Sequence, residues 1–265
     1  MTYSKEANKE IYLIMATKFD QHFLEDKHML SKIIISSRLK KNETVLEIGP
    51  GNGVLTKKIL EKAGNVIAVE IDEKFKKDLS KLDGLELHFG NILQIIDSLK
   101  FDKVVANIPY SISEPLFKKL FKIKLKKSVL LIGKNFYDLI NSKESKLSLI
   151  INTFFKIKLI KPVPKECFNP KPRVDSVLIS LTMNKSKDKF SKILREFILQ
   201  DDKKVKNSLI KIFRDNLKMT KNESRAKIIS LDINKNILEL NVDRLSNKQF
   251  YYIVEKIKTI YDLWI

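Results

Sequence analysis

The sequence contains few of the residues that cross-link chains or bind metals. Its 265 residues include one cysteine, Cys167, and three histidines. A disulfide within the chain is therefore excluded, and because no cluster has the spacing of zinc ligands, we expect no metal site. No run approaches the roughly 20 apolar residues that span a bilayer, and the apolar stretch 11–16 is too short for the core of a signal peptide. We therefore expect a cytoplasmic protein with no membrane contact.

Two common enzyme motifs are also missing. The Gly-Lys pair at 133–134 lacks the upstream glycine and the following serine or threonine of a P-loop, which excludes that class of nucleotide hydrolase. No GxSxG elbow supports a serine hydrolase. Glycine itself is scarce, with seven in the chain, so a place where three of them gather needs an explanation.

Acidic residues are outnumbered by basic ones. The chain has 51 Lys and Arg against 32 Asp and Glu, a net charge of +19. A polyanionic partner explains this excess. A biased composition explains it equally well, because all but six of the basic residues are lysine. Residues 1–185 carry +12 and residues 186–265 carry +7, so both parts are able to face a phosphate backbone.

Short β-rich apolar runs alternate with helical stretches in the first two thirds of the chain. The runs are TVLEIG (44–49), NVIAVEI (65–71), LELHF (85–89), DKVVAN (102–107), SVLLIG (128–133) and VDSVLISLT (174–182). The segments between them, such as 55–64, carry apolar residues at helical spacing. This alternation predicts an α/β fold in which βαβ units form a mainly parallel, Rossmann-like sheet.

The pattern changes after residues 184–189, where no further strand is evident. Four segments have the apolar periodicity of amphipathic helices: 190–200, 205–217, 223–231 and 247–264. We therefore predict two domains, a sheet-containing domain over 1–185 and a smaller all-helical domain over 186–265.

Three of the seven glycines lie in one loop, VLEIGPGNGVLT (45–56), between a strand and a helix. Glycines at Gly49, Gly51 and Gly53 allow a sharp turn and the close approach of a ligand. Glu70 ends the next strand, 21 positions after Gly49, where an acidic residue accepts hydrogen bonds from both hydroxyls of a ribose. The order of strand, loop, helix and acidic residue predicts an adenosine-like ligand. The form EIGPGNGxLT is usual in S-adenosylmethionine-dependent methyltransferases, although the glycines alone would also suit a plain turn.

A second motif, NIPYSIS (107–113), follows the fourth predicted strand and should reach the same edge of the sheet. The side-chain oxygen of Asn107 and the carbonyl of Ile108 are suited to accept the two hydrogens of an exocyclic adenine amine, which aims the amine lone pair at a methyl donor. Pro109 fixes the backbone, and Tyr110 offers a face on which a base stacks. This arrangement favours catalysis by orientation rather than by a strong base. A base must leave its stack to enter such a pocket.

These motifs together resemble the rRNA adenine N6-dimethyltransferases, a family of class I methyltransferases that includes the KsgA-type small-subunit enzymes and the erythromycin-resistance methylases. The similar segments, in the family's order, are FDQHFLEDKHML (19–30), VLEIGPGNGVLT (45–56), VIAVEID (66–72), GNIL (90–93), VVANIPYSIS (104–113) and CFNPKPRVDSVLISL (167–181). The last segment, FxPKPxVDS, is nearly diagnostic. The resemblance covers most of the chain.

The resemblance implies roles for individual residues. The implied cofactor contacts, for S-adenosylmethionine, are His22, Leu24, Gly49, Gly51, Glu70, Asn91 and Asn107. The implied residues around the target adenine are Asn107, Pro109, Tyr110 and Phe168. Phe168 would stack on the adenine, although a buried aromatic at a strand edge is an alternative. Lys171 and Arg173 would meet RNA phosphates.

The segment 197–211 resembles the start of the helical domain of the small-subunit enzymes. It implies dimethylation of two adjacent adenosines near the 3′ end of small-subunit rRNA, on an immature small ribosomal subunit, by a monomer. Two alternatives are methylation of large-subunit rRNA, as in macrolide resistance, and a non-catalytic RNA-binding assembly or transcription factor on the same fold.

Three positions depart from the family pattern. Asn91 stands where an aspartate is usual, which should weaken cofactor binding by about 1 kcal/mol because the acceptor loses its charge. Asp20 replaces a glycine, and SKLS (145–148) replaces Gly-Arg-Leu-Ser. The last two changes bear on closure of the N-terminal loop and on RNA contacts.

Overall fold

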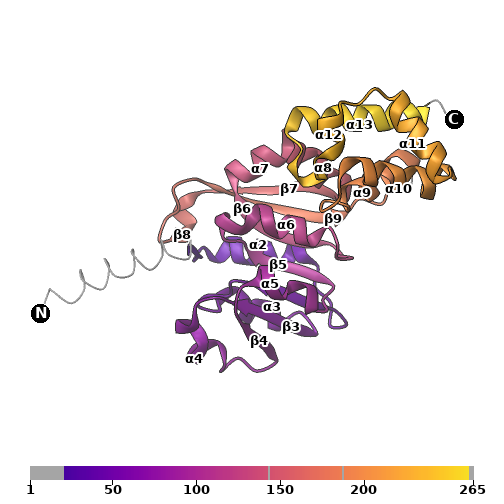
Figure 1. Ribbon diagram of the computed structural model, residues 1–265. Helices are drawn as coiled ribbons and strands as arrows, with labels where there is room; N and C mark the ends of the chain where they lie inside the picture. The colour runs from indigo at the N-terminus through magenta and orange to yellow at the C-terminus, as the bar shows by residue number, and fades with distance from the viewer. Residues whose placement is uncertain (1–20, 143, 187, 263–265) are drawn as a thin grey trace, which may run out of the picture. The chain divides into compact units, whose positions relative to one another are not determined.

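The computed structural model describes residues 21–142, 144–186 and 188–262 and divides into two compact units. Among the described residues, the first unit contains 21–139 together with 155–183, and the second contains 140–154 together with 184–262 (Figure 1). The predicted boundary at 185 therefore differs from the structure in one segment, because 140–154 groups with the C-terminal helices. Asp20 and the apolar stretch 11–16 lie outside the described residues.

The first unit is built on a seven-stranded sheet with the order β4-β3-β2-β5-β6-β9-β7. Its strands are β2 (Thr44–Ile48), β3 (Asn65–Glu70), β4 (Leu85–Phe89), β5 (Lys103–Asn107), β6 (Ser128–Gly133), β7 (Phe155–Val163) and β9 (Ser176–Met183). The first five strands in this order are parallel, and β9 is antiparallel to both β6 and β7. The predicted α/β class with a mainly parallel sheet is confirmed.

The sequence patterns missed strand β7. Its segment FKIKLIKPV alternates lysine with apolar residues, and Lys156, Lys158 and Lys161 are exposed. β7 lies at the edge of the sheet, where one face of the strand meets water, so it lacks the continuous apolar run of the inner strands. Alternation with period two was the available signal.

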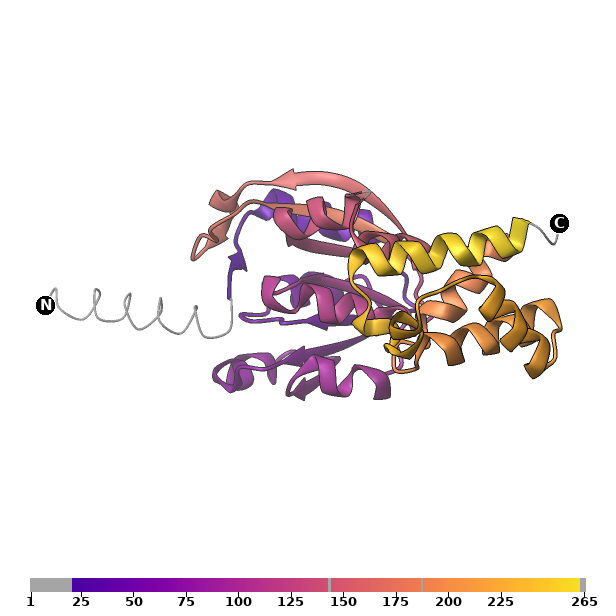
Figure 2. The ribbon, with the colours of Figure 1, turned by 45° about the horizontal axis from the view of Figure 1, so that its top comes forward.

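Helices cover both faces of this sheet (Figure 2). The helices of this unit are α2 (Lys27–Ser37), α3 (Val54–Leu60), α4 (Lys76–Leu79), α5 (Ile92–Ile95), α6 (Ser113–Leu120) and α7 (Lys134–Asn141), the last two residues of which belong to the second unit, with 3₁₀ turns at Glu73–Phe75, Ile96–Ser98, Tyr110–Ile112 and Lys165–Cys167. A separate two-stranded ladder pairs β1 (Phe23–Leu24) with β8 (Phe168–Asn169).

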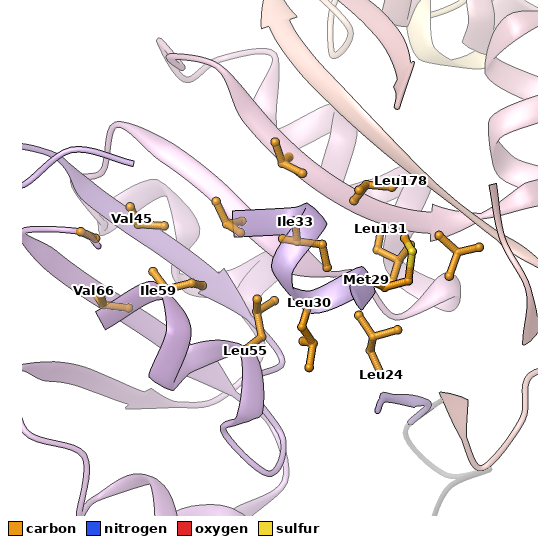
Figure 3. Close-up of a cluster of buried hydrophobic side chains, with 14 of the residues drawn as sticks. Leu24, Met29, Leu30, Ile33, Val45, Leu55, Ile59, Val66, Leu131 and Leu178 are labelled. Carbon is orange, nitrogen blue, oxygen red and sulfur yellow. The ribbon is translucent and has the colours of Figure 1, made fainter. Parts of the chain in front are cut away.

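One face of the sheet packs against α2 and α3 (Figure 3). Met29, Leu30 and Ile33 recur at helical spacing on α2 and meet strand side chains such as Leu131 and Leu178. Asp26 caps the N-terminus of α2, and its carboxylate accepts the Met29 N–H at 2.7 Å. Elsewhere in the first unit, the Phe117 ring forms edge-to-face pairs with Phe136 and with Phe155.

The second unit is a helical bundle. Its helices are α8 (Lys146–Phe154), α9 (Lys189–Ile198), α10 (Val205–Leu217), α11 (Lys221–Ser230), α12 (Lys235–Glu239) and α13 (Asn247–Asp262), with a 3₁₀ turn at Val242–Arg244. α10 packs against α9, α11 and α12, while α13 packs against α8 and α9. The four helices predicted from periodicity are present, and the five-residue α12 is additional.

Two basic side chains in the second unit hold its turns together. Lys146 Nζ donates to the carbonyls of Val242, Asp243 and Leu245 at 2.9–3.1 Å. The Arg195 guanidinium donates to the carbonyls of Thr153, Asn184 and Ser186. Lys146 lies in the segment SKLS (145–148), which differs from the family pattern. Its ammonium group provides hydrogen bonds to backbone carbonyls.

A buried ion pair fixes the edge of the sheet at which the parallel strands start. Lys103, the first residue of β5, lies 2.8 Å from Glu43, and both side chains are 5% exposed. Lys103 also donates to the carbonyls of Ser37 and Arg38 at the end of α2. Because every donor of the ammonium group has a partner, the pair ties α2 to β2 and β5.

Replacing Lys103 tests this link. We expect Lys103→Met to lower the free energy of unfolding by about 3 kcal/mol, because it leaves the Glu43 carboxylate buried and two carbonyls unsatisfied. Lys126, half exposed and 3.7 Å from Glu43, provides the matched control, and Lys126→Met should cost less than about 1 kcal/mol. Urea denaturation measures both, and equal losses would contradict the assigned role of the buried pair.

Candidate active site at the ends of β2 and β5

A cleft opens where the strand order reverses. β2 connects forward to β3 on one side, whereas β5 connects to β6 on the other, so the point between β2 and β5 is the topological switch of the sheet. The cleft at their carboxyl ends has an empty volume of about 500 Å³, including the part open to solvent. The predicted site residues that line it are His22, Gly49, Gly51, Glu70, Asn107, Pro109 and Tyr110.

The glycine loop adopts a backbone that favours glycine. Gly49, Gly51 and Gly53 have φ angles of +66°, +54° and +74°. At Gly51 space is also limiting, because a Cβ atom there would lie 2.5 Å from Cε1 of Phe23. The sequence pattern predicted that a ligand approaches Gly51 closely. In the structure the group that does so is the Phe23 ring.

Glu70 fastens this loop to the neighbouring strand. Its Oε2 accepts the Gly51 N–H, and its Oε1 accepts the N–H groups of Ile71 and Asp72, all at 2.9 Å. Burial raises the pKa of Glu70, and these three N–H groups oppose that rise. Since a carboxylate oxygen accepts two hydrogen bonds, Oε2 retains room for one more donor from a ligand in the cleft.

Asn107, the last residue of β5, is oriented by the segment 21–23, which lines the cleft. Its Nδ2 donates to the His22 carbonyl at 2.7 Å, and the His22 ring Nδ1 lies 2.9 Å from the Pro170 carbonyl. In the part of the chain that the structure describes, no protein group donates to Oδ1 of Asn107. Next along the chain, the Ile108 N–H donates to Leu131 of β6 at 2.9 Å, which fixes the following peptide.

Tyr110 lies flat against the sheet. Its ring covers Gly133, where a Cβ atom would lie 3.3–3.4 Å from three ring carbons, and its hydroxyl is hydrogen-bonded to Ser176 Oγ. The His22 ring lies 5.8 Å away, centroid to centroid, at 34°. The cleft is therefore bounded on this side by the face of an aromatic ring.

Three of the predicted residues lie outside the lining of this cleft. Leu24 is buried and faces an adjoining cavity beneath the glycine loop. Phe168 is 3% exposed and belongs to the core cluster, paired in register with Leu24, which is the buried position that the sequence left open as an alternative. Asn91 caps α5, with its Oδ1 accepting the Leu93 N–H at 2.9 Å.

Sequence reasoning missed a polar clamp beside the cleft. Gln21 donates to Asp72 at 2.9 Å, and Lys74 reaches both Gln21 and Asp72 at 2.8 Å. Burial opposes ionisation of Asp72, but the hydrogen bonds from Lys74 and Gln21 outweigh it and lower the pKa. The clamp holds the start of the 21–24 segment to the end of β3. The signal was the IDEK sequence directly after Glu70.

A second carboxyl group lies under the loop. Glu47 of β2 is 2% exposed, and burial raises its pKa to about 8; the nearby Thr56 hydroxyl opposes this rise and the Glu70 carboxylate adds to it. Its Oε2 atom has no hydrogen-bond partner among the described residues. Glu47 also faces the adjoining cavity that Leu24 and Asn107 line.

The charge of the cleft is opposite to that of the chain. No lysine or arginine is among its lining residues, although the chain contains 51 of them, and Glu70 lies in its wall. Such a site disfavours a phosphate-bearing dinucleotide and suits a neutral or cationic ligand. The described residues contain no cluster of acidic, histidine or cysteine side chains able to hold a metal ion, and none of their helices is long and apolar enough to cross a membrane.

The buried Glu47 predicts a pH dependence of stability. A carboxyl group whose pKa is 4.5 unfolded and about 8 folded binds its proton more tightly in the folded state, so stability falls as the pH rises through this window. We expect the free energy of unfolding of the wild type to fall relative to that of Glu47→Gln as the pH rises from 5 to 8. The difference should change by at most about 1.4 kcal/mol per pH unit. Urea denaturation at several pH values measures the difference, and a constant difference would rule out this titration.

Comparisons with known proteins agree with this geometry. The family model for ribosomal RNA adenine dimethylases matches residues 14–258. A Thermotoga petrophila protein named ribosomal RNA small subunit methyltransferase A is 32% identical over 201 residues, covering 71% of this chain and 77% of its own. A crystal structure of a dimethyladenosine transferase from Plasmodium falciparum has a TM-score of 0.62 at 26% identity, covering 90% of this chain and 98% of its own.

A more distant solved structure shows the fold alone. The 23S rRNA methyltransferase ErmE has a TM-score of 0.55 at 18% identity, over 89% of this chain and 99% of its own. The confirmed fold is therefore a class I methyltransferase sheet followed by a helical part. With the family model spanning nearly the whole sequence, the chain belongs to the ribosomal RNA adenine dimethylase family.

Proposed function

We propose that this chain uses S-adenosylmethionine to dimethylate the exocyclic amines of two adjacent adenosines near the 3′ end of small-subunit rRNA, during assembly of the small ribosomal subunit. The observation that carries the proposal is the orientation of Asn107. Its Nδ2 is bound to the His22 carbonyl, which leaves Oδ1, an acceptor, in the wall of the cleft.

The cofactor side of the cleft fits an adenosine-type methyl donor. Glu70 Oε2 is placed to accept one ribose hydroxyl beyond its bond to Gly51, and the absence of lysine and arginine from the lining suits a positively charged sulfur. When bound, S-adenosylmethionine supplies a methyl group on a sulfonium centre. Residues 21–23 line the cleft on the side of the N-terminal segment.

The residues of the NIPY motif then orient the acceptor amine. Asn107 Oδ1 and the Ile108 carbonyl accept its two hydrogens. These hydrogen bonds direct the lone pair of the nitrogen at the methyl group and increase the electron density on the nitrogen. The Ile108 N–H bond to Leu131 and the fixed φ of Pro109 hold that carbonyl in place. Tyr110 stacks on the extruded base, a contact worth about 1–3 kcal/mol.

The partner of this reaction is a polyanion. The net charge of +19 supports phosphate contacts by both parts of the chain, including Lys171 and Arg173 of the first unit and the helical residues from 186 to 265. Phe168 completes the target site in this proposal only after its ring leaves the core cluster that holds it. We propose that the chain acts as a monomer.

The first test follows labelled methyl groups from S-adenosylmethionine to unmethylated small ribosomal subunits, with the modified nucleosides identified. We expect dimethyladenosine with the wild type and a rate at least about 100-fold lower with Asn107→Ala, because the amine loses its orientation. Asn65→Ala, an exposed residue at the start of β3, is the control and should retain activity. Transfer to large subunits instead of small ones would refute the proposed substrate.

A second test concerns Asn91. Its Oδ1 accepts the Leu93 N–H, which leaves one uncharged acceptor position for the cofactor adenine. An aspartate keeps one oxygen for the cap and offers the other, which carries charge, to the adenine amine. We therefore expect Asn91→Asp to tighten S-adenosylmethionine binding about fivefold, measured by calorimetry, because the hydrogen bond becomes charge-assisted. Unchanged affinity would place Asn91 outside the cofactor site.

A further inference from the structure

The FxPKPxVDS motif ends in two residues, Asp175 and Ser176, to which the sequence assigned no role. Ser176 is the first residue of β9 and is fully buried. Its hydroxyl is hydrogen-bonded to the phenol of Tyr110, 66 positions earlier in the chain. A buried hydroxyl needs a partner, and here the partner is the side chain on which the target base would stack.

We propose that Ser176 is a positioning residue for methyl transfer, whose hydroxyl fixes the ring plane of Tyr110 so that the acceptor base stacks in register with Asn107. This inference rests on the proposed function. Ser176 acts through Tyr110 and does not itself contact the base or the cofactor.

The ring of Tyr110 is held at three places. Its backbone begins the 3₁₀ turn after Pro109, its face lies on Gly133, and its hydroxyl reaches Ser176. Gly133 and Ser176 are directly opposite each other in the antiparallel pairing of β6 and β9. The ring therefore spans two hydrogen-bonded strands at one level of the sheet, and a side chain at position 133 would lift it from this surface.

The anchor is itself rigid. β9 lies between β6 and β7 and is paired with both, and the Asp175 carbonyl accepts the Lys134 N–H at 2.9 Å. The Asp175 carboxylate accepts the Lys165 N–H at 3.0 Å, in the turn that leads to Phe168. Ser176 thus holds the Tyr110 ring, and Asp175 holds the turn that precedes Phe168.

Fixing the ring matters because orientation supplies the rate in this mechanism. An unanchored tyrosine rotates about two side-chain torsions, and ordering them costs free energy each time a base binds. A displacement of about 1 Å at a reacting centre is enough to lower a rate strongly. The hydrogen bond to Ser176 removes this freedom before the base arrives.

A double-mutant cycle separates positioning from packing. The variants are Ser176→Ala, Tyr110→Phe and the combination, with Ser180→Ala as the matched control, because Ser180 is a buried serine four residues along the same strand. Thermal unfolding first checks that all four are folded. Methyl transfer to small subunits then gives kcat and KM, and calorimetry gives the Kd of S-adenosylmethionine.

We expect Ser176→Ala and Tyr110→Phe to lower kcat by a similar factor, about 5- to 20-fold, and the combined variant to be no slower than Tyr110→Phe alone. The cofactor Kd should stay within about twofold of wild type, and Ser180→Ala should retain wild-type kcat. Losses that multiply in the combined variant, or an unchanged kcat in Ser176→Ala, would overturn the proposal while leaving the proposed function intact.

A measurement without turnover distinguishes the two ideas. The ¹³Cζ resonance of Tyr110, identified by its loss in Tyr110→Phe, should move in Ser176→Ala and stay in place in Ser180→Ala. An unmoved resonance overturns the proposal whatever the activity. If the wild type methylates neither subunit, the proposed function fails and the positioning role fails with it, and a moved resonance then marks the bond as purely structural.

Discussion

The Glu70 carboxylate is the constraint on which the cleft depends. By accepting N–H groups from Gly51, Ile71 and Asp72, it joins the loop after β2 to the turn after β3. The glycine loop holds a left-handed backbone at three positions, which glycine adopts without strain, so hydrogen bonds such as the one to Glu70 must fix the position of the loop. Once the two turns are joined, Gly51 presents a surface against which the Phe23 ring closes. Because three backbone N–H groups stabilise the Glu70 carboxylate, it needs no lysine or arginine partner in the wall of the cleft.

The chemistry of the site follows from where hydrogen-bond capacity is left over. Asn107 donates from its amide nitrogen to a backbone carbonyl and thereby keeps an acceptor in the cleft wall. Glu70 keeps one acceptor position after three backbone donors are bound. The cleft therefore offers acceptors and an aromatic face, with no strong base in contact with either. An amine whose lone pair is delocalised is suited to activation by such acceptors, because they draw on its hydrogens without removing one beforehand.

Short-range patterns predicted what depends on short-range physics. The inner strands are continuous apolar runs, and the glycine loop and NIPY motif occupy the ends of β2 and β5, where parallel topology must bring them together. β7 escaped because an edge strand with lysines on its wet face has no apolar run. The places of Leu24 and Phe168 were equally hidden, because their burial depends on pairing between segments more than 140 residues apart. The Gln21–Asp72–Lys74 clamp has the same long-range origin.

That long-range pairing links the two halves of the site. Leu24 and Phe168 are opposite each other in the β1–β8 ladder, and the His22 ring binds the Pro170 carbonyl. The 21–24 segment is therefore paired with the segment that carries Phe168. Each strand of this ladder has only two residues, so few backbone hydrogen bonds hold it. The same short segment that pairs with Phe168 carries His22, whose carbonyl accepts the Asn107 amide. The β1–β8 ladder, the His22 ring and the Asn107 amide are in this way joined by one continuous set of contacts.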